Sequence, residues 1–343
     1  MEKKVALKDV AKHIGVSVAL VSYVLNGKEK EARVGAEMAE RIRKAATELN
    51  YQPNLIAKGL KMGKTKTIGL IVADISNPFF STIARIIEDD AKKHGYVVIF
   101  GSSDESAERQ RDLIDVFSTR LVDAFIIAPA AGTEQQIANI VKRDIPVVLI
   151  DRFFPELKVD CVHINNFKAA GKAVTQLIRN NRTRIGMLAY DTPQSHMQDR
   201  KQGYKAALKE NDIRFKKAWL LEASYHDIEK DVAAKMESLL RPLQVDALFF
   251  ATNSLAVASL KIINKMGIRV PEDLAIISFD ESDAFDFFYS PVTYVNQSLT
   301  DIGKEAIKLV INRLHSKTKQ TREIIVEAKL VVRESCGHKL KNK

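Results

Sequence analysis

Cysteine is scarce in this sequence, and long apolar runs are missing. The 343 residues include two cysteines, Cys161 and Cys336, which stand far apart and form no CxxC or zinc-type spacing. Two cysteines so far apart provide no disulfide framework. The absence of a CxxC or zinc-type spacing argues against metal and thiol chemistry. The longest apolar stretches, such as residues 124–131, fall far short of the roughly 20 residues that cross a bilayer. No apolar run follows the first lysines as a secretion signal requires, so we expect a cytoplasmic chain that contacts no membrane.

Motifs of the common enzyme classes are missing as well. The sequence has no GxSxG, HExxH or GxGxxG and no nucleophile with a base at recognisable spacing. The stretch GLKMGKT, residues 59–65, ends like a phosphate-binding loop, but that motif requires glycine where Lys58 stands. We therefore expect no catalytic residue, no bound metal and no cofactor. Two rival interpretations are a sugar- or nucleotide-processing enzyme on a doubly wound fold and a protein that only stores or delivers sugar.

Positive charge is concentrated at the start of the chain. Residues 1–66 hold 14 Lys and Arg against 7 Asp and Glu, which accounts for 7 of the net charge of +10 and leaves +3 for the other 277 residues. A basic first fifth on a nearly neutral body predicts a polyanion partner for the N-terminal segment alone.

Two short amphipathic runs around one glycine indicate the kind of polyanion. Gly15 ends the first run, because glycine adopts the left-handed conformation cheaply after a helix. Ser17 can cap a second helix, which stops at Asn26 and Gly27. A third run, residues 36–49, would complete a three-helix core. This pattern is typical of a helix-turn-helix, whose second helix enters the major groove of DNA. The apolar residues of the first run keep helical spacing: Leu7, Val10, Ala11 and Ile14.

From residue 67 onward, apolar runs alternate with helical patterns. Near-continuous apolar runs are typical of buried parallel strands, and helices between them give βαβ units. Two successive sets predict an α/β body of two doubly wound lobes. Such folds bind small molecules at the carboxyl ends of their strands, so we expect a ligand between the lobes. The runs are residues 68–73, 97–100, 124–128 and 147–150, then 185–189, 247–251 and 274–279.

Acidic, amide and basic residues follow several of these runs, and Phe79 stands close behind the first. Carboxylates accept hydrogen bonds from vicinal hydroxyl groups, guanidinium groups donate them, and an aromatic ring offers a stacking face. The set therefore suits a polyhydroxylated ring. Taken singly, each aspartate is more often a helix cap or a turn residue than a ligand. The polar residues concerned are Asp74, Asp151, Arg152, Arg200, Asn253 and Asp280.

Seven stretches of the chain, between Leu7 and Ser335, match one known pattern in its order. They read LKDVAKHIGVSVALVSYVLNG, ELNYQPNLIAKGL, TIGLIVADISNPFF, IDR, RVPEDLAIISFDE, SPVTYVNQSL and LVVRES. Together they resemble the lactose-repressor (LacI/GalR) family of bacterial transcription regulators. The resemblance implies a DNA-binding domain, a hinge and a periplasmic-binding-protein-like effector domain. The implied bounds are 1–50 for the DNA-binding domain, 51–66 for the hinge, 67–163 and 294–322 for the N-lobe, 164–293 and 323–338 for the C-lobe, and 339–343 for a tail.

The resemblance also implies which residues touch DNA. Val18, Ala19 and Tyr23 match positions that read bases, and Leu60 matches a residue that wedges into the minor groove. Gly59 costs about 1 kcal/mol of helix propensity relative to Ala, so we expect a hinge helix that is marginal without DNA. The complete expected set is Lys8, Ser17, Val18, Ala19, Ser22, Tyr23, Asn26, Arg33, Tyr51, Asn54, Lys58 and Leu60.

For Asp151, Arg200, Asn253 and Asp280, the resemblance favours effector contacts over roles as helix caps or turn residues. The family commonly has Asp where Asn165 and Ser254 stand, which removes two possible carboxylates from the site. A sugar or sugar derivative is the first expectation for the effector, and a purine or nucleoside is the second. The complete expected set of effector contacts is Asp74, Phe79, Asp151, Arg152, Arg200, Asn253 and Asp280.

The expected function is that of a sequence-specific DNA-binding regulator, of repressor type, controlled by a small molecule. Operator half-sites impose two-fold symmetry, so we expect a homodimer on a palindromic operator. The run at 77–93 carries an apolar stripe that is either a dimer contact or plain core. Cleft closure on the effector would rotate the first lobes and change the separation of the hinges. The stripe consists of Phe80, Ile83, Ile87 and Ala91.

Overall fold

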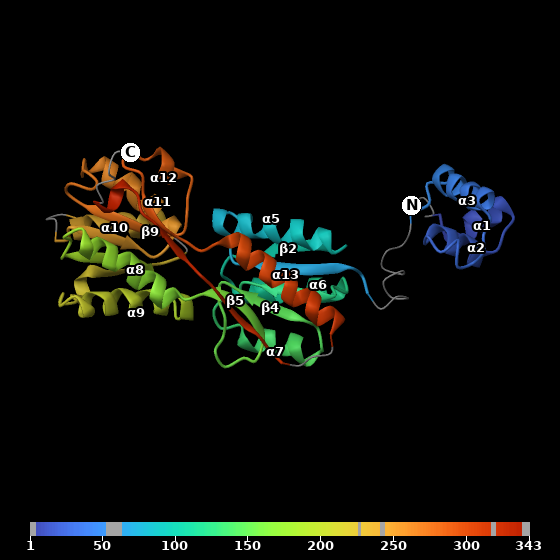
Figure 1. The fold of residues 1–343 in the computed structure, drawn as a ribbon, viewed down its shortest axis with the longest axis horizontal. Coiled ribbons are helices and arrows are strands. Elements are labelled where there is room, and N and C mark those ends of the chain that lie inside the picture. The colour runs from blue at the N-terminus through green and yellow to red at the C-terminus, as the bar shows by residue number, and fades with distance from the viewer. Residues whose placement is uncertain (1–4, 53–63, 226–227, 241–243, 317–319, 338–343) are drawn as a thin grey trace. The chain divides into compact units, whose positions relative to one another are not determined.

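The computed structural model describes residues 5–52, 64–225, 228–240, 244–316 and 320–337. The chain forms two compact units, one ending at Thr65 and the other beginning at Lys66. Figure 1 traces the chain and labels its elements. Within the described ranges, no helix is long and apolar enough to cross a membrane.

The described part of the first unit contains three helices: α1 (Leu7–Ile14), α2 (Val18–Leu25) and α3 (Ala36–Glu48). Gly15 ends α1 with φ at 77°, in the left-handed region that suits glycine. The Ser17 hydroxyl accepts a hydrogen bond from the Leu20 amide at 3.2 Å and so caps α2. The turn glycine, the cap and the three-helix core are thus confirmed. Each helix contributes a fully buried residue to the shared core: Val10, Val21 and Ile42.

The second unit consists of two lobes, each built on a six-stranded sheet. The sheet of the first lobe has the order β11-β5-β4-β3-β1-β2, and all its pairs are parallel. Its strands are β1 (Thr67–Val72), β2 (Val97–Ser102), β3 (Ala124–Ile127), β4 (Val147–Ile150), β5 (Asp160–Ile164) and β11 (Glu323–Val326). The helices are α5 (Pro78–Lys93) and α13 (Leu299–His315) on one face, with α6 (Ala107–Thr119) and α7 (Glu134–Lys142) on the other.

The sheet of the second lobe has the order β12-β10-β9-β8-β6-β7, in which β12 alone is antiparallel to its neighbour. In Figure 1, α8 and α9 lie on one side of this lobe and α10 and α11 on the other. The doubly wound parallel lobes predicted from the apolar runs are confirmed. The strands are β6 (Ile185–Tyr190), β7 (Leu220–Ala223), β8 (Ala247–Phe250), β9 (Ala275–Phe279), β10 (Thr293–Asn296) and β12 (Lys329–Val331), and the α-helices are α8 (Asn166–Arg179), α9 (Ser195–Glu210), α10 (Ile228–Leu240), α11 (Asn253–Lys265) and α12 (Ala284–Phe287).

The chain crosses between the lobes three times. It passes from β5 into α8, from β10 into α13, and from β11 into β12. The expected lobe boundaries at 294 and 323 fall too early. Residues 294–296 still pair in the second sheet, and residues 323–326 pair with β5 in the first. A strand stays with one sheet over its whole hydrogen-bonded length, so each crossing comes after the last paired residue.

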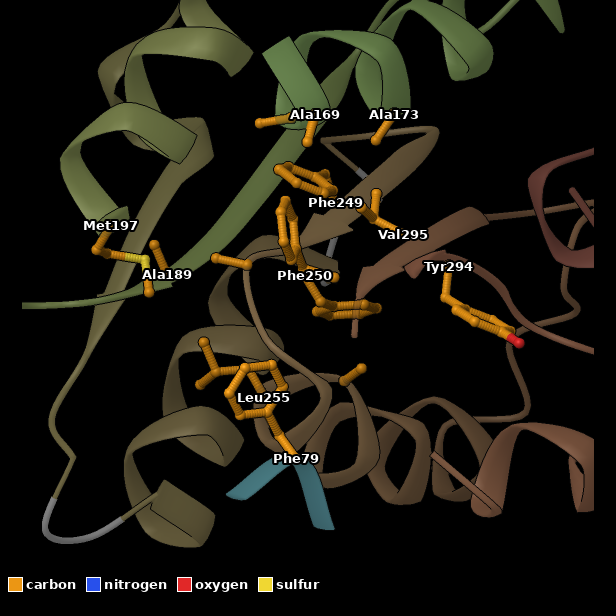
Figure 2. Packing of buried hydrophobic residues seen from close by; sticks show 14 of the residues in the cluster. Phe79, Ala169, Ala173, Ala189, Met197, Phe249, Phe250, Leu255, Tyr294 and Val295 are labelled. Atoms are coloured by element: carbon orange, nitrogen blue, oxygen red, sulfur yellow. The ribbon is translucent and has the colours of Figure 1, made fainter. Parts of the chain in front are cut away.

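Apolar side chains fill the space between each sheet and its helices. Figure 2 shows part of this packing in the second lobe, where Phe249 of β8 lies near Ala169 and Ala173 of α8. Adjacent residues of a strand point to opposite faces, so Phe249 and Phe250 together serve both layers of helices. Phe79, from the start of α5 in the first lobe, belongs to the same buried cluster. The core therefore continues up to the place where the lobes meet.

The apolar stripe of α5 is part of this core. Its four residues are at most 3 % exposed, and they pack in the cluster that also contains α13. Of the two interpretations of the stripe, plain core is correct, and a dimer contact through it is wrong. The physical reason is that α13 returns from the far end of the chain and covers the side of α5 that the sheet leaves open. The sequence of α5 alone does not reveal that α13 packs on its second side.

Close packing of α8 on α9 depends on Gly203. A Cβ atom at Gly203 would stand 2.2 Å from the carbonyl oxygen of Phe167 and 3.1 Å from the Ala170 side chain. The backbone of α8 therefore occupies the space that a side chain would need. This contact fixes α9, whose first turns carry the functional side chains His196 and Arg200.

Candidate functional site

The outer face of α2 in the first unit is exposed. Val18 and Tyr23 are each 46 % exposed, although both are large and mainly apolar. The opposite face of the helix buries Val21 and Val24 in the three-helix core. Exposed apolar side chains flanked by polar ones are typical of an interaction surface. The same face and its cap carry the other predicted residues of this helix: Ser17, Ala19, Ser22 and Asn26.

The connection from α2 to α3 is held by an ion pair between Glu29 and Arg43. It leaves Arg33 exposed, with φ at 51°, just before α3 begins. Of the remaining predicted DNA contacts, Lys8 is exposed and Tyr51 is half-buried. Three of them lie outside the described residues, together with the expected hinge helix: Asn54, Lys58 and Leu60.

A cavity of about 240 Å³ lies between the two lobes of the second unit. It opens at the carboxyl ends of the parallel strands, where doubly wound folds bind ligands. Both lobes supply its walls, and those walls combine carboxylates, guanidinium groups and aromatic rings. Five of the seven predicted effector contacts line it: Phe79, Asp151, Arg152, Arg200 and Asp280.

Two aspartates hold equivalent places on opposite sides of this cavity. Asp151 directly follows β4 of the first lobe, and Asp280 directly follows β9 of the second. Both have positive φ, 65° and 66°, a conformation that is rare for residues other than glycine. The backbone amide of each donates to the next strand, Asp151 to Val162 and Asp280 to Val295, both at 3.0 Å. Strained backbone of this kind is common where a fold aims a side chain at a ligand.

In the first lobe, Asp151 sits beside an ion pair that is already complete. Both terminal nitrogens of Arg152 donate to the carboxylate of Glu105 at 2.6 Å. Burial opposes the charge of Arg152, but Glu105 raises the pKa of its guanidinium above the ordinary value. Arg152 Nε lies 3.4 Å from an Asp151 oxygen. Burial raises the pKa of Asp151 in turn. The guanidinium is thus committed mainly to Glu105.

In the second lobe, Arg200 is held by groups that do not neutralise it. Its Nη1 donates to the carbonyl oxygen of Ala251 at 2.7 Å, and its Nε donates to the Asn166 side chain at 2.8 Å. The guanidinium lies 3.6 Å from the ring centre of Phe279. Only 2 % of this residue is exposed, and burial lowers the pKa of its guanidinium.

Asp280 keeps a free carboxylate edge toward the cavity. One oxygen accepts from the amide of Gln297, and the other lies 3.9 Å from Arg200 Nη1. Burial raises the pKa of Asp280 to about 6, although Arg200 and Gln297 oppose the shift. A carboxylate with few protein partners in a buried cavity has acceptor capacity left for a ligand hydroxyl.

Two predicted effector contacts, Asp74 and Asn253, do not line the cavity. The Asp74 carboxylate accepts from the amide and hydroxyl of Ser76, and from the Tyr225 hydroxyl at 3.4 Å. Asn253 is 3 % exposed and donates to Asn77 and to the Glu281 carbonyl. The polar atoms of both side chains form hydrogen bonds within the protein. Asp74 and Asn253 each connect one lobe to the other through these bonds.

Sequence reasoning missed several residues that line the cavity. His196 lies one helical turn before Arg200 on α9, and its Nδ1 is buried without a hydrogen-bond partner. Burial lowers the pKa of His196 well below its ordinary value, so the ring is neutral and can donate or accept. Gln297 also has a buried oxygen, Oε1, without a partner. The spacing of four from Arg200 was a usable signal for His196. Gln297 follows β10 and was equally open to the strand-end argument.

These groups together are chemically suited to a hydroxylated ligand. Acceptors stand on both sides of the cavity, a neutral imidazole and an amide oxygen still need partners, and Phe79 offers an apolar wall. Buried polar atoms without partners are costly, so a ligand that satisfies them gains affinity. Because Glu105 neutralises the charge of Arg152, the cavity is poorly suited to binding an anion. A neutral polyol fits it better than a phosphate.

Comparison with known proteins decides the family. Residues 6–54 match the bacterial regulatory proteins of the lacI family, and residues 174–336 match a periplasmic binding protein-like domain. The chain is 30 % identical over 330 residues to the ribose operon repressor of Haemophilus influenzae, covering 96 % of this chain and 98 % of that protein. This chain belongs to the LacI family. The resemblance seen in the sequence is confirmed.

Further relatives agree over nearly the whole length. This chain is 31 % identical over 340 residues to the transcriptional repressor CytR of Escherichia coli K12, and the match covers 97 % of each protein. A solved LacI-family regulator from Enterococcus faecium, with bound ribose, matches with a TM-score of 0.70 at 27 % identity, covering 78 % of this chain and 98 % of that one. The function predicted from the sequence, DNA-binding transcriptional regulation, is confirmed, and an enzyme on the same fold is not favoured.

Proposed function

We propose that this LacI-family protein is a repressor whose hold on a palindromic operator is controlled by a sugar or sugar derivative bound between the lobes. The observation that carries the proposal is the pair of buried aspartates, Asp151 and Asp280, that line one cavity from opposite lobes. Carboxylates accept hydrogen bonds from vicinal hydroxyl groups, and Arg200 and Phe79 supply a donor and an aromatic wall. The ribose named for a relative and for a solved neighbour supports the same ligand class.

For DNA, α2 is the recognition helix in this proposal. Val18 and Ala19 offer apolar contact to a thymine methyl group, and the Tyr23 hydroxyl can donate to or accept from a base edge. Lys8 and Arg33 are exposed cations and would bind phosphate, which sets the register of the unit on the duplex. The other predicted contacts of the first unit remain part of the proposal: Ser17, Ser22, Asn26 and Tyr51 near the bases, with Asn54, Lys58 and Leu60 in the hinge.

The homodimer is assigned to the free edge of the first sheet. β2 is the last strand of that sheet, and its residues Val97 and Phe100 are 66 % and 60 % exposed. An exposed edge strand with large apolar side chains is a natural pairing surface. Phe100→Asp should therefore yield monomers in sedimentation experiments. Ile325→Asp, on the opposite edge strand β11, is the matched control and should leave the dimer intact.

Effector control follows from the two-lobed construction. A ligand that contacts Asp151 and Asp280 together stabilises one separation of the lobes over others, since its contacts come from both. It shifts the equilibrium only by its difference in affinity for the two arrangements. In a dimer joined through the first lobes, that shift changes how far apart the two DNA-binding units are held. Both induction and co-repression fit this mechanism.

Selection of random duplex DNA by the purified full chain tests the regulator function. The selection is run at physiological salt, with and without a pooled mixture of sugars. We expect an enriched palindrome whose enrichment changes when sugar is present. Salt-sensitive binding without an enriched sequence in either condition would mean that the first unit only holds phosphates, and the proposal would fail.

Calorimetry on the full chain identifies the ligand class. A panel of pentoses, hexoses and disaccharides is compared with purine bases and nucleosides. We expect heat from at least one sugar and none from free bases. Heat from bases alone would overturn the sugar assignment. That outcome would leave the DNA-binding function untouched, because the two measurements report on different units.

A further inference from the structure

Strands β5 and β11 of the first lobe bring a cysteine, a histidine and a glutamate together, away from the effector cavity. Cys161 and His163 stand two residues apart on β5, and Glu323 is the register partner of Cys161 on β11. One ligand atom from each side chain lies within 4.8 Å of the other two. The cysteine and the histidine are each 5 % exposed, whereas the Glu323 side chain is 54 % exposed. The cluster is therefore built into the sheet and open to solvent on one side.

The hydrogen bonds of His163 leave one ring nitrogen in need of a cation. Nδ1 lies 2.9 Å from the carbonyl oxygen of Ile164, and since a carbonyl only accepts, Nδ1 carries the proton. Nε2 of a neutral ring is then a lone-pair acceptor, yet it lies 2.8 Å from Glu323 Oε1, a second acceptor. Two acceptors at this distance repel each other unless a positive charge lies between them, either a proton or a metal ion.

The surroundings of His163 favour the metal. A metal-bound histidine usually donates its other ring N–H to a carbonyl or carboxylate, as Nδ1 does here to Ile164. The ring also stacks on Phe153 with centroids 4.3 Å apart, which fixes its direction. A proton shared by His163 and Glu323 gives no role to the thiol, whereas a metal ion uses all three ligands.

We propose that Cys161, His163 and Glu323 bind one Zn²⁺ ion, with a fourth position open to water. Thiolate, imidazole and carboxylate are ligand types of zinc sites, at about 2.3, 2.0 and 2.1 Å from the metal. Tetrahedral coordination at those lengths sets the ligand atoms about 3.3 to 3.6 Å apart. Rotation of the exposed Glu323 side chain can adjust the distance of its carboxylate from the other two ligand atoms. The soft thiolate selects zinc over magnesium or calcium.

The site stands where the chain leaves the first lobe. β5 runs into α8 and β11 runs into β12, so one ion joins two of the three crossover segments. The Ile164 carbonyl that supports His163 also accepts from Asn166 at 3.5 Å, and Asn166 in turn accepts from Arg200 of the effector cavity. A zinc ion at this place would hold together the starts of two of the segments that connect the lobes. The proposal does not depend on which effector the cavity takes.

Zinc titration of the full chain tests the site. Zn²⁺ is added in competition with a chromophoric chelator, and we expect one tightly bound equivalent for each chain. Glu323→Gln changes an exposed side chain that the fold does not need, and it should weaken Zn²⁺ binding by at least about tenfold. Cys161→Ser should do the same. Cys336→Ser, at the other buried cysteine, and His94→Gln, at an exposed histidine, are matched controls and should bind as the parent does.

Cobalt substitution identifies the ligands directly. Co²⁺ bound to the parent should show a thiolate-to-cobalt charge-transfer band, which Cys161→Ser abolishes and Cys336→Ser retains. Zn²⁺ affinity that is equal in the parent, Glu323→Gln and Cys161→Ser would overturn the proposal. So would binding that His94→Gln removes, or a titration in which the chelator keeps all the metal.

Discussion

The two lobes place an aspartate at the same point of the fold and give it different neighbours. Asp151 and Asp280 each follow a central strand with nearly the same positive φ. In the first lobe, Arg152 stands beside Asp151 but gives both terminal nitrogens to Glu105. In the second lobe, the ion pair of Asp280 with Arg200 is long, at 3.9 Å. The first lobe thus holds a complete ion pair beside its aspartate, and the second lobe leaves its aspartate with one long ion pair.

This difference indicates a division of labour across the cleft. A complete buried ion pair contributes mainly rigidity, because its atoms are committed before a ligand arrives. A weakly paired carboxylate in the same cavity has its acceptor capacity left for the ligand. We therefore expect the first lobe to govern stability at the cleft and the second lobe to govern effector affinity. Variants on the two sides of the cleft separate these roles.

Removal of the first lobe's cation should have the largest effect. Arg152→Met removes the guanidinium that contacts both the Glu105 and the Asp151 carboxylates, which should lower the free energy of unfolding by about 3–5 kcal/mol. Arg200→Met should cost less, because burial already lowers the pKa of Arg200 whereas Glu105 raises that of Arg152. Urea-induced unfolding measures both variants.

A double variant provides the control for this first prediction. Glu105→Gln combined with Arg152→Met should recover part of the loss, because it removes one of the two orphaned carboxylates. If Arg200→Met costs as much as Arg152→Met, the proposed difference between the lobes is wrong.

Effector affinity should depend more on the second lobe. Asp280→Asn removes a charged acceptor, and hydrogen bonds to charged groups contribute about 1.5–3 kcal/mol, or roughly 10- to 150-fold in affinity. Asp151→Asn should cost less, since Arg152 lies close to that carboxylate and competes for it. Calorimetry with the tightest sugar of the panel compares the variants. Operator binding without sugar should be unchanged in both, and its loss in Asp280→Asn would assign a folding role to this residue instead.

The helix pair of each lobe offers a matched test of rigidity. Gly203→Ala sets a methyl group against the backbone of α8, where nothing can rotate away, and should destabilise the protein by about 1–3 kcal/mol. Gly303→Ala in α13 of the first lobe meets side-chain atoms alone: Cγ2 of the half-buried Ile86 at 2.6 Å and Cγ1 of Ile87 at 3.6 Å. Rotation of the Ile86 side chain and the higher helix propensity of Ala, about 1 kcal/mol, should leave the second variant near neutral. Thermal unfolding distinguishes them, and equal losses would refute the argument.

The sequence predicted most reliably what depends on near neighbours. Gly15 and Ser17 were assigned correctly because a helix end needs only a left-handed residue and a cap within a few positions. Asp151 and Asp280 were placed at the cavity because parallel strands end at one edge of a sheet. Asp74 satisfies the same rule, yet its carboxylate is taken up by Ser76 and by a tyrosine of the other lobe. Strand-end position predicts where a side chain lies, but not which partner it has.

Contacts between distant segments lay beyond the sequence patterns. The α5 stripe was ambiguous until α13, more than 200 residues later, was seen to cover it. The expectation against metal chemistry considered cysteine pairs, whereas the proposed zinc site has one cysteine and takes its third ligand, Glu323, from β11. The order of strands in the sheet determines which residues become neighbours, and the three crossings between the lobes place β11 next to β5.

The smallest predicted effect is a pH dependence of effector binding that Asp280 of the second lobe should govern. Burial raises the pKa of Asp280 to about 6, so its carboxylate gains a proton as the pH falls through that value. If sugar binds only the ionised form, its affinity at pH 5 should be about tenfold below that at pH 8. A raised carboxyl pKa adds stability at low pH and loses it as the pH rises through about 6, so this group does not unfold the protein on acidification. The loss of affinity is therefore measurable on folded protein.

Two variants assign this pH dependence to its source. Asp280→Asn should bind sugar weakly at both pH values, because the group that titrates is gone. Asp151→Asn should keep the pH dependence of the parent, since Asp280 remains. The opposite result, a flat profile in Asp151→Asn and a retained one in Asp280→Asn, would place the titrating acceptor in the first lobe. The nearby Arg152 would then fail to hold Asp151 ionised, and the ion pair with Glu105 would serve stability alone.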